Sequence, residues 1–269
     1  MIDGALPYLR CPVCGEGLAR TGDQALRCRQ GHSFDIARQG YVNLTAGRSP
    51  HPGDSAEMIA DRAAFLAEGH YAFIAEALAE TVRADDGLVL DAGTGTGDYL
   101  AHVLDALPAV PGLGLDVSKP ALRRAARAHP RAGAALADLW RPLPLADASV
   151  SALLNVFAPR NGPEFHRVLR RDGMLLVVTP APEHLAELVT AHSLIRVDPA
   201  KADRVAQTLG TDFRAEVTTT HSRRLSLTAT ETRTLIGMTP SARHVPLDEI
   251  RAAEQTVTAA VTLTVYRPV

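Results

Sequence analysis

Three glycines alternate with threonines directly after a short apolar run, in the stretch Leu88-Val-Leu-Asp-Ala-Gly-Thr-Gly-Thr-Gly97. Glycine lets a backbone turn sharply and approach a ligand closely, so a strand, this turn and a following helix would open a nucleotide-binding α/β unit. The spacing G-x-G-x-G departs from the dinucleotide fingerprint, G-x-G-x-x-G. A glycine-rich turn in an unrelated α/β protein is the alternative that this stretch alone leaves open.

Two acids end the next two apolar runs and could contact the same ligand. Asp116 follows Leu113-Gly-Leu, where a carboxylate can accept both hydroxyls of a ribose. Alternatively, Asp116 caps the next helix, a role that Ser118 could fill instead. Asp138 could meet an adenine amino group, or it could be a solvated acid in the loop before Pro142.

A further loop is expected to face the reacting group. The fourth apolar run ends in Asn155-Val-Phe-Ala-Pro-Arg160, and ligands of a parallel sheet bind at the carboxyl ends of its strands. Phe157 could stack on an extruded nucleic-acid base, or it could be an ordinary core aromatic.

All the cysteines lie near the N-terminus, in the pattern C-x2-C-x13-C-x3-H formed by Cys11, Cys14, Cys28 and His32. Zn²⁺ favours four such ligands in a tetrahedron, and two close pairs separated by a short hairpin supply them. With no ligand position left open, the metal is expected to be structural. An odd number of cysteines argues against a disulfide framework. A redox Cys-x-x-Cys pair is the alternative, but it leaves Cys28 and His32 unexplained.

The composition is that of an ordinary globular protein. The 269 residues are 46% hydrophobic and 22% charged, with a net charge of -2, so there is no global positive field that would indicate nucleic-acid binding. We find no apolar run of membrane-spanning length and no signal peptide at the N-terminus. These observations predict a cytoplasmic protein with no membrane partner.

The expected elements alternate along the chain from residue 87, which predicts a parallel sheet with helices on both faces. Strands are expected at 88–91, 112–116, 133–138, 149–156 and 174–179, and helices at 54–67, 71–82, 98–107, 119–129, 162–171 and 182–192. Two more strands (224–229 and an antiparallel 259–266) flank a helix at 230–238, and 193–220 is expected to be helix and loop. Proline and glycine mark 39–53 as a linker between a zinc-binding domain, 1–38, and a larger domain, 54–269.

Further motifs occur in order over nearly the whole chain. They are Gly40-Tyr-Val-Asn-Leu44, Pro52-Gly-Asp-Ser-Ala-Glu-Met58, Phe65-Leu-Ala-Glu-Gly-His-Tyr71, Gly114-Leu-Asp-Val-Ser-Lys119, Phe157-Ala-Pro159 and Thr179-Pro-Ala-Pro-Glu-His-Leu185. Together with the cysteine and glycine motifs, they closely resemble the 23S rRNA (guanine-N1)-methyltransferases of the RlmA and tylosin-resistance type.

This resemblance implies a class I S-adenosylmethionine (SAM)-dependent methyltransferase fold, Rossmann-like with a seven-stranded sheet, and a small zinc-binding domain that helps to recognise RNA. It implies methyl transfer to N1 of a guanine in a hairpin loop of 23S rRNA, and a homodimer, and it allows a role in macrolide (tylosin-type) resistance. The implied zinc ligands are the three cysteines and His32. The expected SAM contacts, from the resemblance and from the residues themselves, are Tyr71, Asp91, Gly93, Gly95, Thr96, Gly97, Asp116, Asp138 and His184.

The sequence departs from the family at Thr96, where some relatives carry an acid, and at Asn155, where some carry arginine. The catalytic base that removes the N1 proton is not identified, and the candidate catalytic residues are Asp54, Asp138 and Phe157. Arginines near the zinc motif would contact phosphates: Arg10, Arg27, Arg29 and Arg38.

Two other functions stay open. One is a SAM-dependent methyltransferase of small molecules, which has little need for a zinc knuckle. The other is a non-catalytic zinc-knuckle RNA-binding protein, which the intact glycine turn and Asp116 disfavour.

Overall fold

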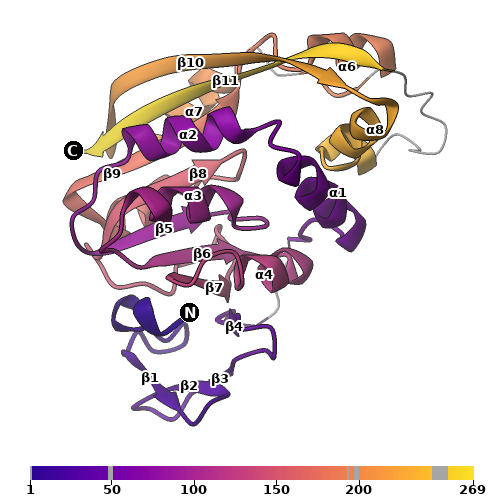
Figure 1. The fold of residues 1–269 in the computed structure, drawn as a ribbon. Helices are drawn as coiled ribbons and strands as arrows, with labels where there is room; N and C mark the ends of the chain where they lie inside the picture. The colour runs from indigo at the N-terminus through magenta and orange to yellow at the C-terminus, as the bar shows by residue number, and fades with distance from the viewer. Residues whose placement is uncertain (1, 48–50, 193, 197–199, 244–253) are drawn as a thin grey trace.

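The computed structural model describes residues 2–47, 51–192, 194–196, 200–243 and 254–269. It contains a small three-stranded sheet near the N-terminus and a large eight-stranded sheet flanked by helices (Figure 1). The small sheet has the order β1-β2-β3 and is formed by β1 (Leu18–Thr21), β2 (Ala25–Cys28) and β3 (Ser33–Asp35).

The large sheet has the strand order β10-β11-β9-β8-β5-β6-β7-β4. Neighbouring strands are parallel except at β11, which pairs antiparallel with both β9 and β10 as predicted. Its strands are β4 (Val42–Asn43), β5 (Leu88–Ala92), β6 (Gly112–Asp116), β7 (Ala132–Leu136), β8 (Val150–Val156), β9 (Leu169–Pro180), β10 (Phe213–Leu227) and β11 (Gln255–Pro268).

The seven expected strands are all present, and β4 adds an eighth at the sheet edge. Val42 and Asn43 pair with Ala135 and Leu136 of β7. They come from the segment 39–53 that proline and glycine marked as a linker. The side chain of Val42 is fully buried, and burial of this apolar residue favours pairing over a free connection.

The helices are α1 (Ala56–Ala67), α2 (Ala72–Thr81), α3 (Asp98–Ala106), α4 (Lys119–Ala125), α5 (Gly162–Val168), α6 (Ala186–His192), α7 (Lys201–Leu209) and α8 (Ala229–Gly237). Helices α4 and α5 are shorter than predicted, and α5 ends because β9 begins at the next residue. The segment 193–220, expected to be helix and loop, contains α7 but also half of β10, so the loop prediction was wrong there.

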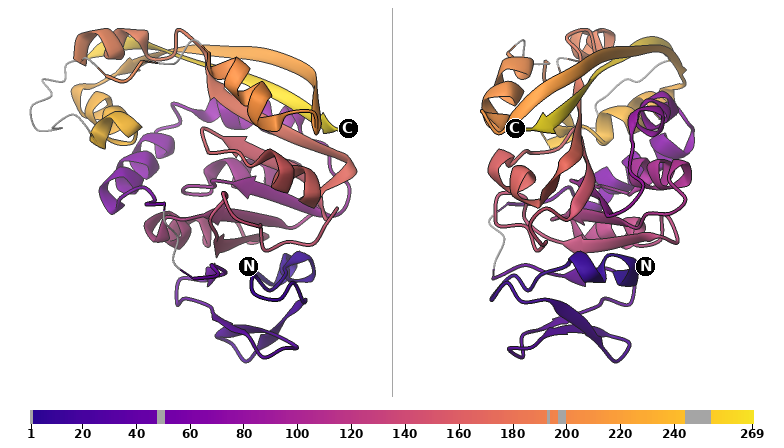
Figure 2. Two further views of the ribbon diagram at one scale, coloured as in Figure 1. Left: turned by 180° about the vertical axis from the view of Figure 1, so that it is seen from behind. Right: turned by 90° about the vertical axis from the view of Figure 1, so that its left-hand side faces the viewer.

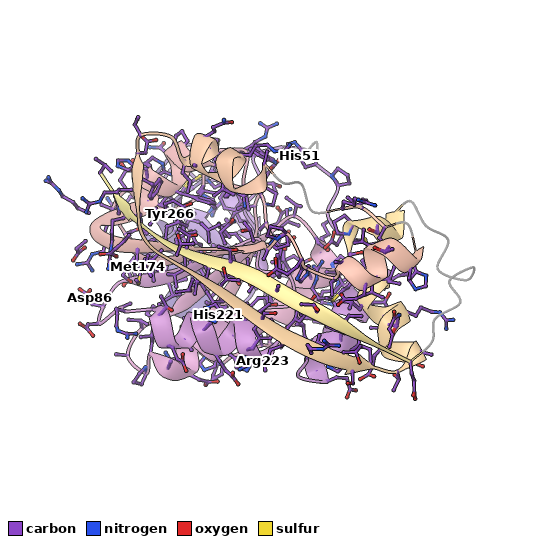
Figure 3. The ribbon with its side chains drawn as sticks, turned by 90° about the horizontal axis from the view of Figure 1, so that it is seen from above. His51, Asp86, Met174, His221, Arg223 and Tyr266 are labelled. Atoms are coloured by element: carbon purple, nitrogen blue, oxygen red, sulfur yellow. The ribbon has the colours of Figure 1, made fainter. Side chains whose placement is uncertain are left out.

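The missed half of β10 lies in a long two-stranded ribbon. Figure 3 shows β10 and β11 crossing one face of the molecule, with His221 and Arg223 on β10. Nearly every residue from Arg214 to Arg224 is exposed. An edge strand with both faces in water lacks the apolar alternation by which strands are predicted.

Helices lie on both sides of the large sheet (Figure 2), and two apolar clusters of buried residues pack against it. One contains Ile74 and Leu78 of α2 packed with α3 and the sheet. The other continues from the sheet into the N-terminal unit, where Leu26 and Phe34 belong to the same cluster as Leu113. The zinc-ligand region therefore shares a core with the large sheet. Within the described ranges, we find no helix with the length and apolarity needed to cross a membrane.

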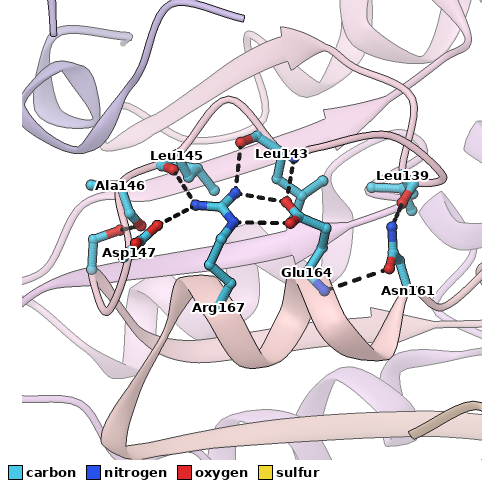
Figure 4. A network of polar contacts seen from close by, with 9 residues as sticks. Leu139, Leu143, Leu145, Ala146, Asp147, Asn161, Glu164 and Arg167 are labelled. Carbon is cyan, nitrogen blue, oxygen red and sulfur yellow. Dashed lines mark hydrogen bonds and ion pairs between the residues drawn. The ribbon is translucent and has the colours of Figure 1, made fainter. Parts of the chain in front are cut away.

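A polar network fixes the loop that connects β7 to β8 (Figure 4). The guanidinium of Arg167 donates to Glu164 at 2.6 Å and to Asp147 at 2.7 Å, and it also bonds the carbonyls of Leu143 and Leu145. Bidentate arginine–carboxylate pairs hold their geometry well. The loop that follows Asp138 is therefore held against α5.

Candidate functional site

The four predicted metal ligands come together in the N-terminal unit. The ligand atoms of Cys11, Cys14, Cys28 and His32 all lie within 4.8 Å of one another. The Cys14 and Cys28 sulfurs are 3.7 Å apart, and the Cys28 sulfur lies 3.3 Å from Nδ1 of His32. A zinc tetrahedron with Zn–S bonds of about 2.3 Å has S···S edges of about 3.8 Å. The donor set therefore fits Zn²⁺.

Local backbone geometry explains how each half of this cluster forms. Gly15 follows Cys14, and Gly31 lies between Cys28 and His32. Both are in left-handed conformations, with φ of +76° and +88°. Their N–H groups donate to the carbonyls of Cys11 and Cys28, respectively. A residue with a Cβ is strained in this conformation, so glycine suits both turns.

The glycine turn after β5 is equally specific in its backbone. Gly93, Gly95 and Gly97 all have positive φ. A Cβ placed on Gly93 would lie 2.3 Å from the Cβ of Ala158, in the loop after β8. The turn therefore needs glycine for its close packing as well as for its conformation.

Asp91 supports the turn from inside the protein. Its carboxylate is almost completely buried and accepts a hydrogen bond of 2.8 Å from the Thr94 hydroxyl. Burial raises the pKa of Asp91 to about 7. Thr94 in turn packs against Gly114, where a Cβ would lie only 2.7 Å from the threonine side chain. The side chains of Asp91 and Thr94 therefore fit closely against Gly114.

Asp116, at the end of β6, is held by two backbone groups. Its Oδ2 accepts from the Gly95 N–H at 2.9 Å, and its Oδ1 accepts from the Ser118 N–H at 2.8 Å. Burial raises the pKa of Asp116, and these two N–H groups oppose that shift. Ser118 accepts from the Ala121 N–H and is the N-cap of α4, so the capping role falls to Ser118. Asp116 keeps acceptor capacity for a ribose.

Asp138 lies beyond β7, and both of its carboxylate oxygens are engaged. Its Oδ2 is 2.9 Å from Nδ1 of His51, and its Oδ1 accepts from the Trp140 N–H at 3.1 Å. The Trp140 side chain is 53% exposed. Helix α5 helps to place this loop, since Asn161 donates to the carbonyl of Leu139 at 2.9 Å.

Tyr71, His184 and Phe157 form an aromatic group. The Tyr71 hydroxyl lies 3.4 Å from Nε2 of His184, and the rings of Phe157 and His184 are 6.0 Å apart. Phe157 is 43% exposed and has a φ of +52°, an uncommon backbone conformation for an aromatic residue. This exposure is not that of an ordinary core aromatic, one of the two alternatives considered for Phe157.

Thr96 and Asn155 form hydrogen bonds within the loops that surround the glycine turn. The Thr96 hydroxyl donates to the side chain of Asp98. The Asn155 amide is fully buried and donates to the carbonyls of Ala92 and Pro159. Asn155 thus ties the loop after β8 to the end of β5.

Sequence reasoning missed Arg62. Its guanidinium forms an ion pair of 2.7 Å with Asp54 and donates to the Met238 carbonyl at 3.1 Å. A Cβ placed on Gly95 would lie 3.4 Å from Nη1 of Arg62. An arginine in the middle of a helix resembles any solvated charge in a sequence, and only the fold brings it to the glycine turn. The same holds for His51, 87 residues from its partner Asp138.

A cleft with a volume of about 680 Å³ lies beside the metal cluster. It is lined by three of the four predicted phosphate-binding arginines, Arg10, Arg27 and Arg29, together with residues 14–19. Cationic side chains around an open cleft are suited to a polyanion.

Both the N-terminal unit and the large sheet match families of known proteins. A family model described as "RlmA, N-terminal" matches residues 9–46, and one described as "Methyltransferase domain" matches residues 89–173. The YcgJ protein of Bacillus subtilis has a similar fold, with a TM-score of 0.51 at 15% identity, covering 74% of this chain and 98% of that one.

Full-length relatives identify the family. A protein of Micromonospora griseorubida named "Putative 23S rRNA (guanine-N(1)-)-methyltransferase" is 58% identical, over 98% of both chains. The 23S rRNA (guanine(748)-N(1))-methyltransferase of Streptomyces fradiae is 48% identical, over 97% of both chains. With a zinc-ribbon cluster and a methyltransferase sheet in one chain, the protein belongs to the family of 23S rRNA (guanine-N1)-methyltransferases.

Proposed function

We propose that this protein transfers a methyl group from SAM to N1 of a guanine in 23S rRNA. Two relatives with this activity in their names match it over nearly their full length. The observation that carries the proposal in the molecule itself is the pairing of the glycine turn with Asp116 through the Gly95 N–H, 2.9 Å away. That pairing builds a nucleoside cradle at the carboxyl end of a parallel sheet.

Each residue of the site can be assigned a contact with SAM. Asp116 accepts the ribose hydroxyls, and Asp138 accepts the adenine amino group once His51 yields one carboxylate oxygen. The turn of Gly93, Gly95 and Gly97 passes beneath the ligand with Thr96, and Asp91 supports that turn. Tyr71 and His184 contact the end of SAM that lies away from its adenine. When bound, SAM supplies a methyl group that its sulfonium makes electrophilic.

The aromatic group is suited to hold the acceptor base. Phe157 stacks on the guanine, since stacking on an exposed ring favours an extruded base. His184 stays neutral because burial lowers its pKa to about 4. Alignment of the two reacting atoms then provides much of the acceleration.

The N1 proton of guanine must leave before or during transfer. Asp54 and Asp138 are the candidate bases, and each would first have to leave a partner: Arg62 at 2.7 Å for Asp54, His51 at 2.9 Å for Asp138. Asp116 is engaged by two N–H groups. We therefore propose that the ionised fraction of guanine N1 is the nucleophile.

The N-terminal unit would contact the RNA. In this proposal, residues 1–38 form a zinc-binding domain, 39–53 a connection and 54–269 the methyltransferase domain, and the cleft of Arg10, Arg27 and Arg29 holds phosphates near a hairpin loop. A homodimer, a cytoplasmic location and tylosin-type resistance belong to the same proposal.

The test is methyl transfer from labelled SAM to unmodified 23S rRNA, followed by primer extension. A methyl group on N1 blocks Watson–Crick pairing and stops the polymerase, so a single SAM-dependent stop in a hairpin loop is expected. The Asp116→Ala variant serves as the matched control and should give no stop. Labelling without a stop would contradict N1 as the acceptor. SAM binding without any RNA labelling would favour a small-molecule substrate, and RNA binding without SAM binding a non-catalytic protein. Drug susceptibility of cells with and without the gene tests resistance.

A further inference from the structure

Arg62 approaches the glycine turn from a helix outside that motif. It lies in α1, yet its Nη1 is 3.4 Å from the position that a Cβ on Gly95 would take, and its Nη2 donates to the Met238 carbonyl at the end of α8. It is also among the charged groups that act on Asp116, whose pKa burial raises and Arg62 opposes. One cation thus faces the turn, the ribose acceptor and α8.

In this structure Arg62 pairs with the carboxylate of Asp54, whose backbone is held in place. Asp54 pairs with Nη2 at 2.7 Å, and its own carbonyl accepts from the Ser118 hydroxyl at 2.8 Å. Gly53, next to it, packs so closely that a Cβ there would lie 2.8 Å from Ser118. The backbone at Asp54 is therefore held against Ser118, two residues after Asp116. The side chains of Asp54 and Arg62 stay about one-quarter exposed.

The chemistry of the ligand calls for such a cation. SAM is an adenosine joined through sulfur to an amino-acid arm, and the arm ends in a carboxylate. Asp116 and Asp138 account for the adenosine part, but both are acids and cannot bind a carboxylate. Arginine binds a carboxylate through two parallel N–H groups, and such charge-assisted pairs are stronger than neutral hydrogen bonds.

We propose that Arg62 binds the carboxylate of the amino-acid arm of SAM, releasing the Asp54 carboxylate in exchange. The inference rests on the proposed function, because it assigns a new contact within the same cofactor site. Arg62 pairs with one carboxylate before and after the exchange, since that of the ligand replaces that of Asp54. It also links the ligand to α1 and α8, both of which Arg62 touches.

The test compares ligands that differ in the arm. S-Adenosylhomocysteine carries the carboxylate, and 5′-methylthioadenosine keeps the adenosine and a thioether but has no arm. Titration calorimetry of Arg62→Met should show binding of SAM and S-adenosylhomocysteine weakened about tenfold or more, the loss expected for a hydrogen-bonded charge pair. Binding of 5′-methylthioadenosine should change less than about twofold.

Two further variants separate ligand binding from a structural tie. Asp54→Asn removes the competing carboxylate and should tighten SAM binding about two- to fivefold, the range of an exposed ion pair. If Arg62 only ties α1 down through Asp54, this variant weakens SAM instead. Arg62→Lys, which keeps the charge, should lose part of the SAM affinity and supplies the measurement if the methionine variant does not fold.

Arg170→Met is the matched control. Arg170 pairs with Asp86 at 2.6 Å on the surface before β5, a position marked by Asp86 in Figure 3, and its loss should leave all three ligands unaffected. Equal weakening of SAM and 5′-methylthioadenosine by Arg62→Met, or no weakening of either, overturns the inference. A wild-type protein that binds none of the ligands contradicts the proposed function instead.

Discussion

The backbone N–H of Ala260 donates to Nδ1 of His184 at 3.1 Å. Since Nδ1 is thereby an acceptor, a neutral His184 ring carries its proton on Nε2, the atom that faces the Tyr71 hydroxyl at 3.4 Å. His184 follows β9, and Ala260 lies in β11, the antiparallel neighbour of β9. Insertion of β11 into the sheet thus sets the tautomer of a histidine at the proposed methyl-transfer site.

His184 makes the native state sensitive to acid. Burial lowers its pKa to about 4, whereas an unfolded histidine takes up a proton near pH 6.5. The unfolded state therefore gains protons first as pH falls between these values, and the free energy of unfolding decreases by about 1 kcal/mol per pH unit. We expect His184→Gln to flatten this slope in urea unfolding measured from pH 7 to pH 4.5. An unchanged slope would contradict the burial argument.

Asp91 has the opposite effect on the same curve. Its pKa is raised to about 7 by burial, so the folded protein binds this proton at a higher pH than the unfolded chain does. Stability from this group is present below the unfolded pKa and is lost as pH rises through 7. Asp91→Asn should raise the melting temperature at pH 8 more than at pH 5, since an amide oxygen can still accept from Thr94. Equal effects at both pH values would show that burial does not raise the pKa of Asp91 in the folded protein.

Replacement of Gly93 should remove cofactor binding by two mechanisms. Gly93→Ala puts a Cβ 2.3 Å from Ala158 and forces a residue with a side chain into a φ of +87°. Gly22→Ala is a matched control, because Gly22 also has positive φ but has nothing within 4 Å of its Cβ position. The control should lose about 1 kcal/mol of stability and keep its SAM affinity. Calorimetric SAM titration and thermal unfolding of both variants give the answer, and retention of SAM binding by Gly93→Ala contradicts it.

Removal of the metal should affect more than the N-terminal unit. Strong chelation, or Cys28→Ser, is expected to lower the melting temperature of the whole chain, because Leu26 and Phe34 share an apolar cluster with Leu113 of the large sheet. Zinc content by mass spectrometry and hydrogen exchange of β7 check this. Cys14 is the exposed ligand, so Cys14→Ser serves as a milder comparison. Loss of zinc with no change in β7 exchange would separate the two units.

Methylation should accelerate with pH. If ionised guanine is the nucleophile, the single-turnover rate rises through neutral pH towards the alkaline pKa of guanine N1, with no plateau from a protein carboxylate. Quench-flow assays at saturating SAM test this, with melting curves at each pH as the stability control. A rate that is flat above pH 6 would identify a protein base instead, and Asp54→Asn and Asp138→Asn would then be compared.

The sequence was most informative where function depends on local spacing. The ligands of the metal cluster and the glycine turn each lie within a few tens of residues, and their geometry follows from cysteine pairs and left-handed glycines. Alternating apolar runs likewise predicted the parallel strands. Contacts between distant segments carried no such signal: Arg62 meets a carbonyl 176 residues away. The exposed half of β10 was missed because no buried face imposes a period on it.

The short strand β4 has a mechanical consequence. Its continuation at Leu44 donates to the Leu136 carbonyl at 3.0 Å, at the end of β7, two residues before Asp138. The arginine cleft beside the cysteine cluster and Asp138, the acid proposed to contact adenine, are therefore joined through paired backbone segments. An RNA that contacts both the cleft and Asp138 must span the distance between them. Its length and curvature then contribute to recognition as much as the identity of its bases.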